Sequence, residues 1–284
     1  VRRDGSSRFA KGSRWGTFPS VSLGYNIAKE AFFPFKEKIS MMKFRFSWGS
    51  IGNQNVANYL YAPVMSTGQT TYLLGSDRAY TINAPSETTS GLTWEKVNTK
   101  DIGLDMYVFN NKLSITADCY QSDNTALIGP GVVVPEIYGG TVPKANNGTL
   151  RTRGWEVQIN WRQSLSKGFA YFANFNLSDY KSVVTSYNNP LRLLSTFYEG
   201  ETIGEIWGYR TDGLFQSVEE VDKRAIDQKL FYKGTWAPGD LKYRDLDGDG
   251  VITQGQKKAD DHGDMTVIGN STPRYHFGFS AGAS

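Results

Sequence analysis

Apolar and polar residues alternate along seven stretches of the chain. The period of the alternation is two, which places apolar side chains on one face of an extended strand and polar side chains on the other. We therefore expect β-strands at residues 20–28, 42–49, 101–108, 113–120, 155–162, 169–178 and 275–281. Each of these strands has one apolar and one polar face, so the pattern predicts an all-β protein built on an antiparallel sheet.

The connections between the expected strands alternate in length. Short connections follow the first, third and fifth strands, and long ones follow the second, fourth and sixth. The short connections are 29–40, 109–112 and 163–168, and the long ones are about 50–97, 121–150 and 181–273. In an up-and-down antiparallel sheet this order places every short turn at one end and every long loop at the other. Outer-membrane β-barrels have this arrangement, with short periplasmic turns and long extracellular loops.

The lengths of the strands and the positions of the tryptophans agree with a transmembrane barrel. A strand of about ten residues, tilted by about 40°, rises roughly 25 Å, which is the height of the lipid-facing apolar band. Five tryptophans fall on the apolar side of the strands that they flank or occupy, near both ends, as in an interfacial girdle. They are Trp15, Trp48, Trp94, Trp155 and Trp161. Since seven strands cannot close a wide barrel, we expect the chain to contribute part of a larger one.

A soluble, secreted β-sandwich that binds carbohydrate and holds a structural calcium is the alternative interpretation. It explains the alternation, because such a fold also has one face in a core and one in water. It explains neither the tryptophan positions nor the strict order of short and long connections. A barrel without transport activity and a secreted hydrolase are weaker alternatives.

The connection at 181–272 has the features of a folded domain. It holds 15 acidic and 11 basic residues, whereas the whole chain has 28 and 31. Ser217 and Glu220 form a capping box, and Val221, Ala225, Ile226 and Leu230 follow at helical spacing. We therefore divide the chain into three parts. They are barrel strands with their connecting loops at 1–180, a long extracellular loop domain at 181–272, and a further barrel strand at 273–284.

Composition excludes several classes of function. Cys119 is the one cysteine, so the chain has no internal disulfide and no cysteine-built zinc site. Two histidines leave little for a histidine triad, and we expect no enzymatic activity. A net charge of +3 is too small to indicate nucleic-acid binding. The chain opens on Val1-Arg2-Arg3 and not on methionine or a signal peptide, so we expect a fragment of a longer protein.

The run DLDGDGVI at 245–252 indicates a metal site. Asp245, Asp247 and Asp249 occupy positions 1, 3 and 5 of an EF-hand-type loop, Gly250 occupies position 6, and the carbonyl of Val251 is a further ligand. Position 12 is Gln256 where a bidentate glutamate is expected, and Asp260, Asp261 or Asp264 is the substitute. We therefore expect a structural Ca²⁺ and no organic cofactor. The alternative is an acidic turn whose aspartates cap backbone amides.

Several short motifs resemble the SusC/RagA family of TonB-linked outer-membrane proteins. In chain order they are RDGSSRF (3–9), FPSVSLG (18–24), GSIGNQ (49–54), WEK (94–96), DIGLD (101–105), RGWE (153–156), GYRTDGLFQ (208–216), PGDLKY (238–243), DLDGDG (245–250) and TVIGN (266–270). The motifs cover nearly the whole chain in the order of the family. The sequence departs from the family after Gly250, where five charged residues precede the last motif.

The resemblance implies the later part of a plugged outer-membrane barrel of about 22 strands, a size typical of such transporters. It implies nutrient uptake in Bacteroidetes, with a glycan oligosaccharide or a peptide as the substrate. It also implies a SusD-like surface lipoprotein that covers the barrel, and TonB, which acts through an N-terminal part that this chain lacks. The location implied is the bacterial outer membrane, in contact with lipid and with no nucleic acid as a partner.

Overall fold

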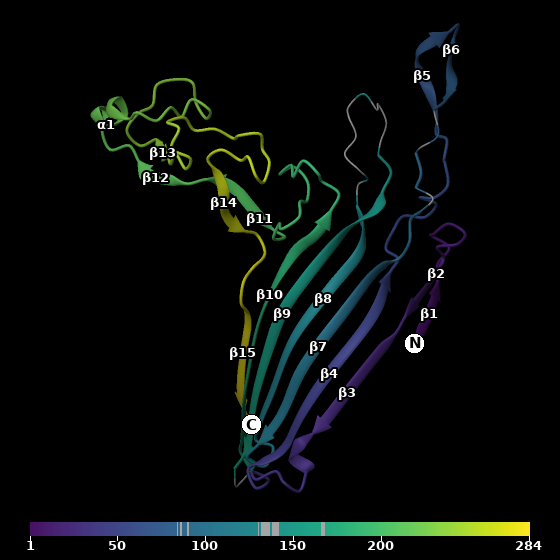
Figure 1. Ribbon diagram of the computed structural model, residues 1–284, viewed down its shortest axis with the longest axis vertical. Coiled ribbons are helices and arrows are strands. Elements are labelled where there is room, and N and C mark those ends of the chain that lie inside the picture. The colour runs from purple at the N-terminus through teal and green to yellow at the C-terminus, as the bar shows by residue number, and fades with distance from the viewer. Residues whose placement is uncertain are drawn as a thin grey trace. The chain divides into compact units, whose positions relative to one another are not determined.

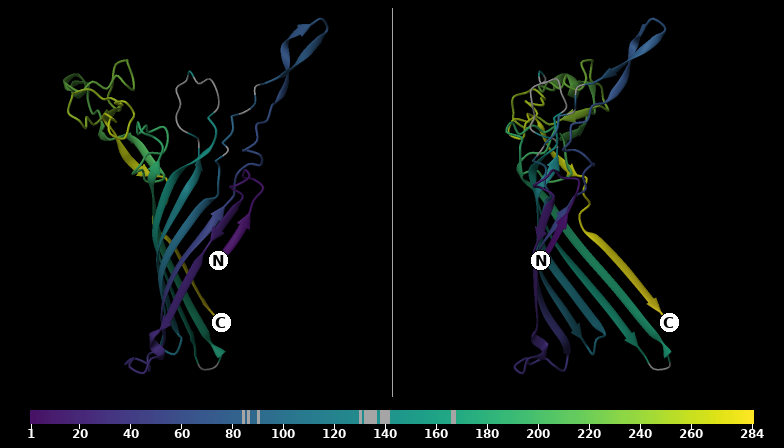
Figure 2. Two further views of the ribbon diagram at one scale, coloured as in Figure 1. Left: turned by 45° about the vertical axis from the view of Figure 1, so that its right-hand side comes forward. Right: turned by 90° about the vertical axis from the view of Figure 1, so that its right-hand side faces the viewer.

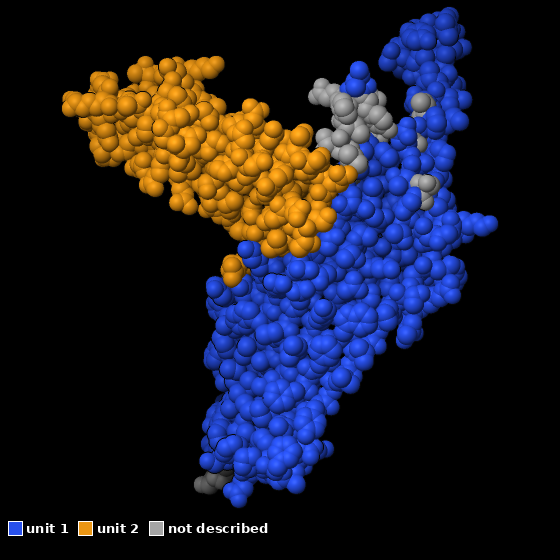
Figure 3. Space-filling view, in the orientation of Figure 1, with its two compact units in different colours: residues 1–182, 275–284 blue, residues 183–274 orange. Residues whose placement is uncertain are grey.

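A computed structural model describes residues 1–83, 85, 87–89, 91–129, 131, 137, 142–165 and 168–284. The chain forms two compact units, which Figure 3 distinguishes by colour. The first unit contains residues 1–182 and 275–284, and the second contains residues 183–274. Among the described residues, no helix is both long and apolar enough to cross a membrane.

All seven predicted strands pair into one sheet, seen in three views in Figures 1 and 2. Its order is β15-β10-β9-β8-β7-β4-β3, and every described register is antiparallel. The strands are β3 (Ser20–Asn26), β4 (Ile39–Asn53), β7 (Glu95–Val108), β8 (Leu113–Gly129), β9 (Ala145–Ser164), β10 (Ala170–Tyr187) and β15 (His276–Ala283). The prediction of an antiparallel all-β fold is therefore confirmed. In the described part of the chain these strands form one sheet and not two packed sheets, which contradicts the sandwich alternative.

The short connections lie at one end of the sheet, as the sequence predicts (Figure 1). The 3-10 helix η1 (Ile27–Lys29) follows β3, and a four-residue turn joins β7 to β8. That turn has three consecutive residues with positive φ, Phe109 at 56°, Asn110 at 55° and Asn111 at 66°. Asparagine tolerates this region better than most residues, and the Phe109 ring packs edge-on against Trp161 at 6.5 Å. Residues 166 and 167 of the third short connection lie outside the described residues.

One face of the sheet is apolar and exposed. A row of apolar side chains crosses five strands in register, formed by Leu23, Phe46, Ile102, Cys119 and Trp155. Leu23 and Ile102 at its edge and centre are 67% and 63% exposed. An apolar surface of this extent on a soluble protein would aggregate, whereas on a barrel it faces lipid.

The strands are longer than the alternation predicts. β8, β9 and β10 have 17, 20 and 18 residues, and each extends toward the long connections. In this extension the outward positions become polar: Arg153 donates to Gln121 at 2.8 Å, and Arg151 pairs with Asp123 at 2.6 Å. Backbone pairing therefore continues past the end of the apolar band, where the sequence pattern stops.

A small core lies beside the first hairpin, formed by β1 (Arg2–Gly5) and β2 (Trp15–Phe18). Phe9, Phe18, Leu92 and Trp94 are at most 4% exposed, and the Trp94 ring lies 5.5 Å from both phenylalanine rings. The interpretation of Trp94 as a girdle residue is therefore wrong. Its indole packs in a core and donates to the carbonyl of Arg14 at 3.1 Å. β5 (Thr67–Leu74) and β6 (Asp77–Ile82) form a further hairpin.

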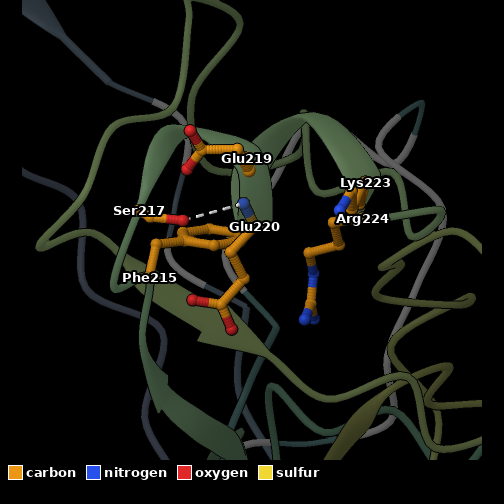
Figure 4. A pocket seen from close by; sticks show the side chains of 6 residues that line it. All are labelled: Phe215, Ser217, Glu219, Glu220, Lys223 and Arg224. Carbon is orange, nitrogen blue, oxygen red and sulfur yellow. Dashed lines mark hydrogen bonds between the residues drawn. The ribbon is translucent and has the colours of Figure 1, made fainter.

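The second unit contains two small sheets and one helix. β11 (Glu205–Tyr209) pairs with β14 (Met265–Asn270), and β12 (Thr211–Leu214) pairs with β13 (Leu241–Tyr243). Helix α1 (Val218–Lys223) begins after Ser217, whose hydroxyl accepts the N–H of Glu220 at 3.3 Å, as the capping box predicts (Figure 4).

The predicted continuation of α1 to Leu230 is wrong. The helix ends at Lys223, because the backbone that follows forms hydrogen bonds with a distant segment. The Asp227 N–H donates to the Gly250 carbonyl at 2.8 Å, and the Asp227 carbonyl accepts the N–H of Ile252 at 2.7 Å. These bonds replace the ones that a longer helix would need.

Candidate functional site

The polar face of the seven-stranded sheet carries an ion network. Arg45 on β4 contacts Asp105 on β7 through Nε at 2.7 Å and Asp118 on β8 through Nη2 at 2.7 Å. All three side chains are half-buried, at 21–31% exposure. One guanidinium thus links three neighbouring strands across the face opposite the apolar row.

A glycine makes this network possible. Gly103 stands directly opposite Arg45 and Asp118 in register. A Cβ at this glycine would lie 2.2 Å from Asp118 Oδ1 and 2.6 Å from Arg45 Nη2, so a side chain here would displace the ion pair. Gly154 is similar, because the Tyr120 phenol covers it and would lie 2.5 Å from a Cβ. A glycine inside a strand often marks such a close approach, and the pattern of alternation passes over this signal.

Side-chain hydrogen bonds cross the polar face between other strands. The hydroxyl groups of Thr99 and Ser122 share a hydrogen bond, with their oxygens 3.1 Å apart. Those of Thr152 and Ser182 share another, with their oxygens 2.7 Å apart. Asn174 donates to Ser280 at 3.1 Å. Glu156 stands opposite Asp118 in register. The face therefore offers carboxylates, amides, hydroxyls and guanidinium groups, which suit a hydrated polar solute.

The predicted metal loop forms a compact turn in the second unit. Asp245 accepts the N–H of Gly248 at 2.6 Å and of Gly250 at 2.8 Å. Asp247 accepts the N–H of Asp249 at 3.2 Å, and Asp249 accepts that of Val251 at 2.7 Å. Gly248 and Gly250 have φ of 81° and 85°, a region that favours glycine.

The structure brings a third acid to this loop. Carboxylate oxygens of Asp245, Asp247 and Asp264 lie within 4.8 Å of one another. Asp264 is fully buried and accepts two backbone N–H groups at 2.7 Å, one from Leu246 and one from Thr253. Asp249 is not in this group of three. Of the three acids named as substitutes for position 12, the structure brings Asp264 to the loop, because the chain folds back over the intervening residues.

Two of the carboxylates have shifted pKa values. The N–H groups of Gly250 and Gly248 lower the pKa of Asp245, because they stabilise its ionised form. The N–H of Asp249 lowers the pKa of Asp247, but desolvation and the negative charges of Asp264, Asp249 and Asp245 outweigh it, and the net shift is upward. Three carboxylates in this space repel one another, and a bound cation would remove that repulsion. Oxygen ligands at this spacing fit a hard cation such as Ca²⁺.

A protein-family model matches most of this chain. The model describes a TonB dependent receptor-like β-barrel and covers residues 1–274. The chain belongs to the TonB-dependent receptor family. This agrees with the motifs, with the open antiparallel sheet and with its exposed apolar row.

Curated TonB-dependent receptors are similar over most or nearly all of the chain. The receptor P3 of Formosa agariphila is 28% identical over 99% of this chain and 28% of its own length. The receptor SusC of Bacteroides thetaiotaomicron is 32% identical over 63% of this chain and 18% of its own length. The chain therefore spans less than a third of the length of each of these relatives.

A solved structure has the same fold. The RagAB peptide transporter superposes with a TM-score of 0.74 at 21% identity, covering 99% of this chain and 29% of the matched chain. The comparisons confirm the resemblance to the SusC/RagA receptors, the barrel fold and the outer-membrane location. The TonB-dependent receptor family is one of transporters and not of enzymes, which agrees with the expected lack of catalytic activity.

Proposed function

We propose that this chain forms part of the barrel of a TonB-dependent transporter that imports a nutrient across the bacterial outer membrane. The observation that carries the proposal is the contrast between the two faces of the sheet. One face presents an in-register apolar row to lipid, and the opposite face presents the Arg45 network and side-chain amides to the lumen. The barrel closes when the remaining strands of the full-length protein add to β3 and β15.

We propose a glycan oligosaccharide or a peptide as the substrate. Both are hydrated, polar and rich in hydrogen-bonding groups, and amide and hydroxyl side chains on the polar face match either one. The RagAB peptide transporter is among the similar structures, which supports the peptide class. We propose that a SusD-like surface lipoprotein delivers the substrate and that TonB energises uptake through the plug-bearing part of the protein.

The second unit is proposed as an extracellular loop domain that contacts this lipoprotein. Its acidic loop is proposed to hold Ca²⁺ through Asp245, Asp247 and Asp264, with the Val251 carbonyl as a further ligand. The cation would neutralise the clustered carboxylates and fix the loop. A double substitution, Asp247→Ala with Asp249→Ala, is expected to raise the protease sensitivity of this unit and to reduce copurification of the lipoprotein. Unchanged protease sensitivity together with unchanged copurification would overturn the loop's assigned role.

Uptake by cells tests the transport proposal. A strain that lacks the full-length gene is complemented with wild type or with the double variant Arg45→Gln, Asp118→Asn, and uptake of labelled oligosaccharides and peptides is measured. Wild type should restore uptake of one class, and removal of the energising TonB should abolish it. The double variant Lys233→Gln, Glu199→Gln, which also removes one positive and one negative charge at exposed positions of the second unit, is the charge-matched control. Equal uptake with and without the gene for every solute would contradict the proposal.

A further inference from the structure

A polar row borders the lipid-facing apolar row, on the same face of the sheet and toward the long connections. Two residues beyond Ile102 on β7 is Lys100, and two residues beyond Trp155 on β9 is Arg153. Gln121 of β8 stands between them, opposite Lys100 on one side and Arg153 on the other. A step of two residues moves about 7 Å along a strand and keeps the side chain on the same face. The first positions outside the apolar row are therefore basic on both strands that flank β8.

Three further basic residues lie on this face. Arg151 stands opposite Asp123, and Lys96 stands opposite Thr125. Lys181 lies four residues beyond Leu177 on β10, so it shares the outward side of that strand. We call these five residues the basic belt: Lys96, Lys100, Arg151, Arg153 and Lys181. The side chain of Arg151 is 41% exposed, and the other four residues are exposed as well.

Acidic side chains only partly balance the belt. Asp123 accepts Arg151 Nε at 2.6 Å through one oxygen and Gln121 Nε2 at 2.9 Å through the other. Asp179, on the outward side of β10, is 8% exposed and interacts within the fold. Lys100 and Arg153 lie two strands apart, which is about 10 Å. Like charges on one face of a sheet repel one another, and an anion placed between them would remove this repulsion.

The position of the belt determines which anion it can meet. The apolar row faces lipid, so the next residues along the same face lie at the level of the lipid headgroups. Trp48 stands opposite Lys100 in the polar row, and aromatic side chains are typical of this level. Long basic side chains at such a boundary direct their charged ends toward the headgroups. In outer-membrane barrels the long connections are extracellular, so these headgroups belong to the outer leaflet.

We propose that the basic belt binds the phosphate group of a glycolipid in the outer leaflet. Lys100 and Arg153 are the central donors, and Lys96 and Lys181 extend the site on either side. Phosphate is the matching anion, because its oxygens accept charge-assisted hydrogen bonds from guanidinium and ammonium groups. The acyl chains of the same lipid would lie along the apolar row that begins at Ile102. A lipid therefore contacts both surfaces, whereas free phosphate contacts only the belt.

Native mass spectrometry of the purified full-length protein in detergent tests the proposal. The probes are monophosphoryl lipid A, the same lipid after removal of its phosphate, and inorganic phosphate. Wild type should bind the phosphorylated lipid at least about tenfold more tightly than the dephosphorylated one. The double variant Lys100→Gln, Arg153→Gln should weaken binding of the phosphorylated lipid about 30-fold, because each basic residue near an anionic surface contributes roughly fivefold. Millimolar inorganic phosphate should not displace the lipid.

Two further variants separate a specific site from a general effect of charge. The double variant Lys36→Gln, Lys38→Gln removes the same charge from exposed positions between β3 and β4, at the other end of the sheet, and should bind as wild type does. Lys181→Gln changes one exposed side chain, so it tests the belt even if the first double variant misfolds, and it should weaken binding about fivefold.

Three results would overturn the proposal. They are equal binding of the two lipids by wild type, equal binding of the phosphorylated lipid by wild type and the belt variants, and complete displacement of the lipid by inorganic phosphate. The measurement involves no uptake of a solute, so its outcome is independent of the transport proposal.

Discussion

Arg45 reaches Asp118 across the backbone of Gly103, with Nη2 and Oδ1 2.7 Å apart. The three residues lie on three neighbouring strands, so this pair fastens β4 to β8 over β7. The path is open only because position 103 has no side chain.

Gly103→Ala is therefore expected to destabilise the sheet. The added methyl group displaces the guanidinium or the carboxylate, so the expected cost is that of the lost ion pair, about 1 kcal/mol. The temperature at which the full-length protein loses its compact form on a gel should fall. Gly49→Ala is the control, because a Cβ there meets only Ser20 Cβ at 3.4 Å. If both variants unfold at the temperature of wild type, the contact across Gly103 does not support the sheet.

The apolar row predicts a strong difference between the two faces. Ile102→Lys places a charge in the lipid-facing row, which costs about 2–4 kcal/mol near the middle of the membrane. Gln158→Lys places the same charge on the polar face and should be tolerated. The amount of each folded variant in isolated outer membranes is the measurement. Similar amounts of the two variants would mean that the assigned faces are wrong.

Trp94 and Trp15 form a matched pair for testing the small core. Trp94 is 3% exposed and packs on Phe9 and Phe18, whereas Trp15 is 64% exposed. Trp94→Ala should lower stability by about 3–5 kcal/mol, as expected for a buried tryptophan. Trp15→Ala should change it little. A girdle role for Trp94 requires a different result, in which the two substitutions have similar, small effects.

The acidic loop should respond to pH and to calcium together. The raised pKa of Asp247 means that its ionised form is disfavoured in the folded protein. Without metal, the folded state is stabilised as pH falls through this raised value toward the ordinary pKa near 4. The pKa of Asp245 is lowered, so its ionised form stabilises the folded state. This stabilisation is fully present above the ordinary aspartate pKa and is lost as the pH falls from there through the lowered pKa.

The metal-free second unit should therefore resist proteolysis better as the pH falls from 7 toward the ordinary aspartate pKa near 4. Millimolar Ca²⁺ at pH 7 should give the same protection, and Asp264→Asn should reduce that effect. Limited proteolysis of the full-length protein with and without a chelator measures both. Protection that is independent of pH and of Ca²⁺ would leave the aspartates as caps of backbone amides only.

The pattern of alternation predicts much of the sheet, because the membrane imposes it. Leu23, Ile102 and Phe277 can face lipid only if every second residue is apolar. The order of the strands and the end at which the short turns lie follow from that pattern together with the lengths of the connections, whereas the register does not. Beyond the apolar band no such constraint exists, and the sequence does not predict that β8 extends to Gly129 or that β9 begins at Ala145.

Contacts between distant parts of the chain explain the remaining differences. Trp94 lies on the apolar side of its strand, and only the fold shows that Phe9 covers it. Asp264 is separated from Asp247 by a charged insertion, so local spacing cannot select it among the nearby acids. The motif at 217–220 predicts the start of α1, but backbone bonds from Asp227 to Gly250 and Ile252 end it early. Local patterns predict local structure, and long-range packing decides the rest.

Gel migration of the full-length protein in fractionated cells tests the central claim most directly. The claim is that these seven strands belong to a closed barrel in the outer membrane. An antibody against this segment should detect the protein in outer membranes, in a form that migrates faster before boiling than after it. A protein in the soluble fraction whose migration is unchanged by boiling would contradict the account.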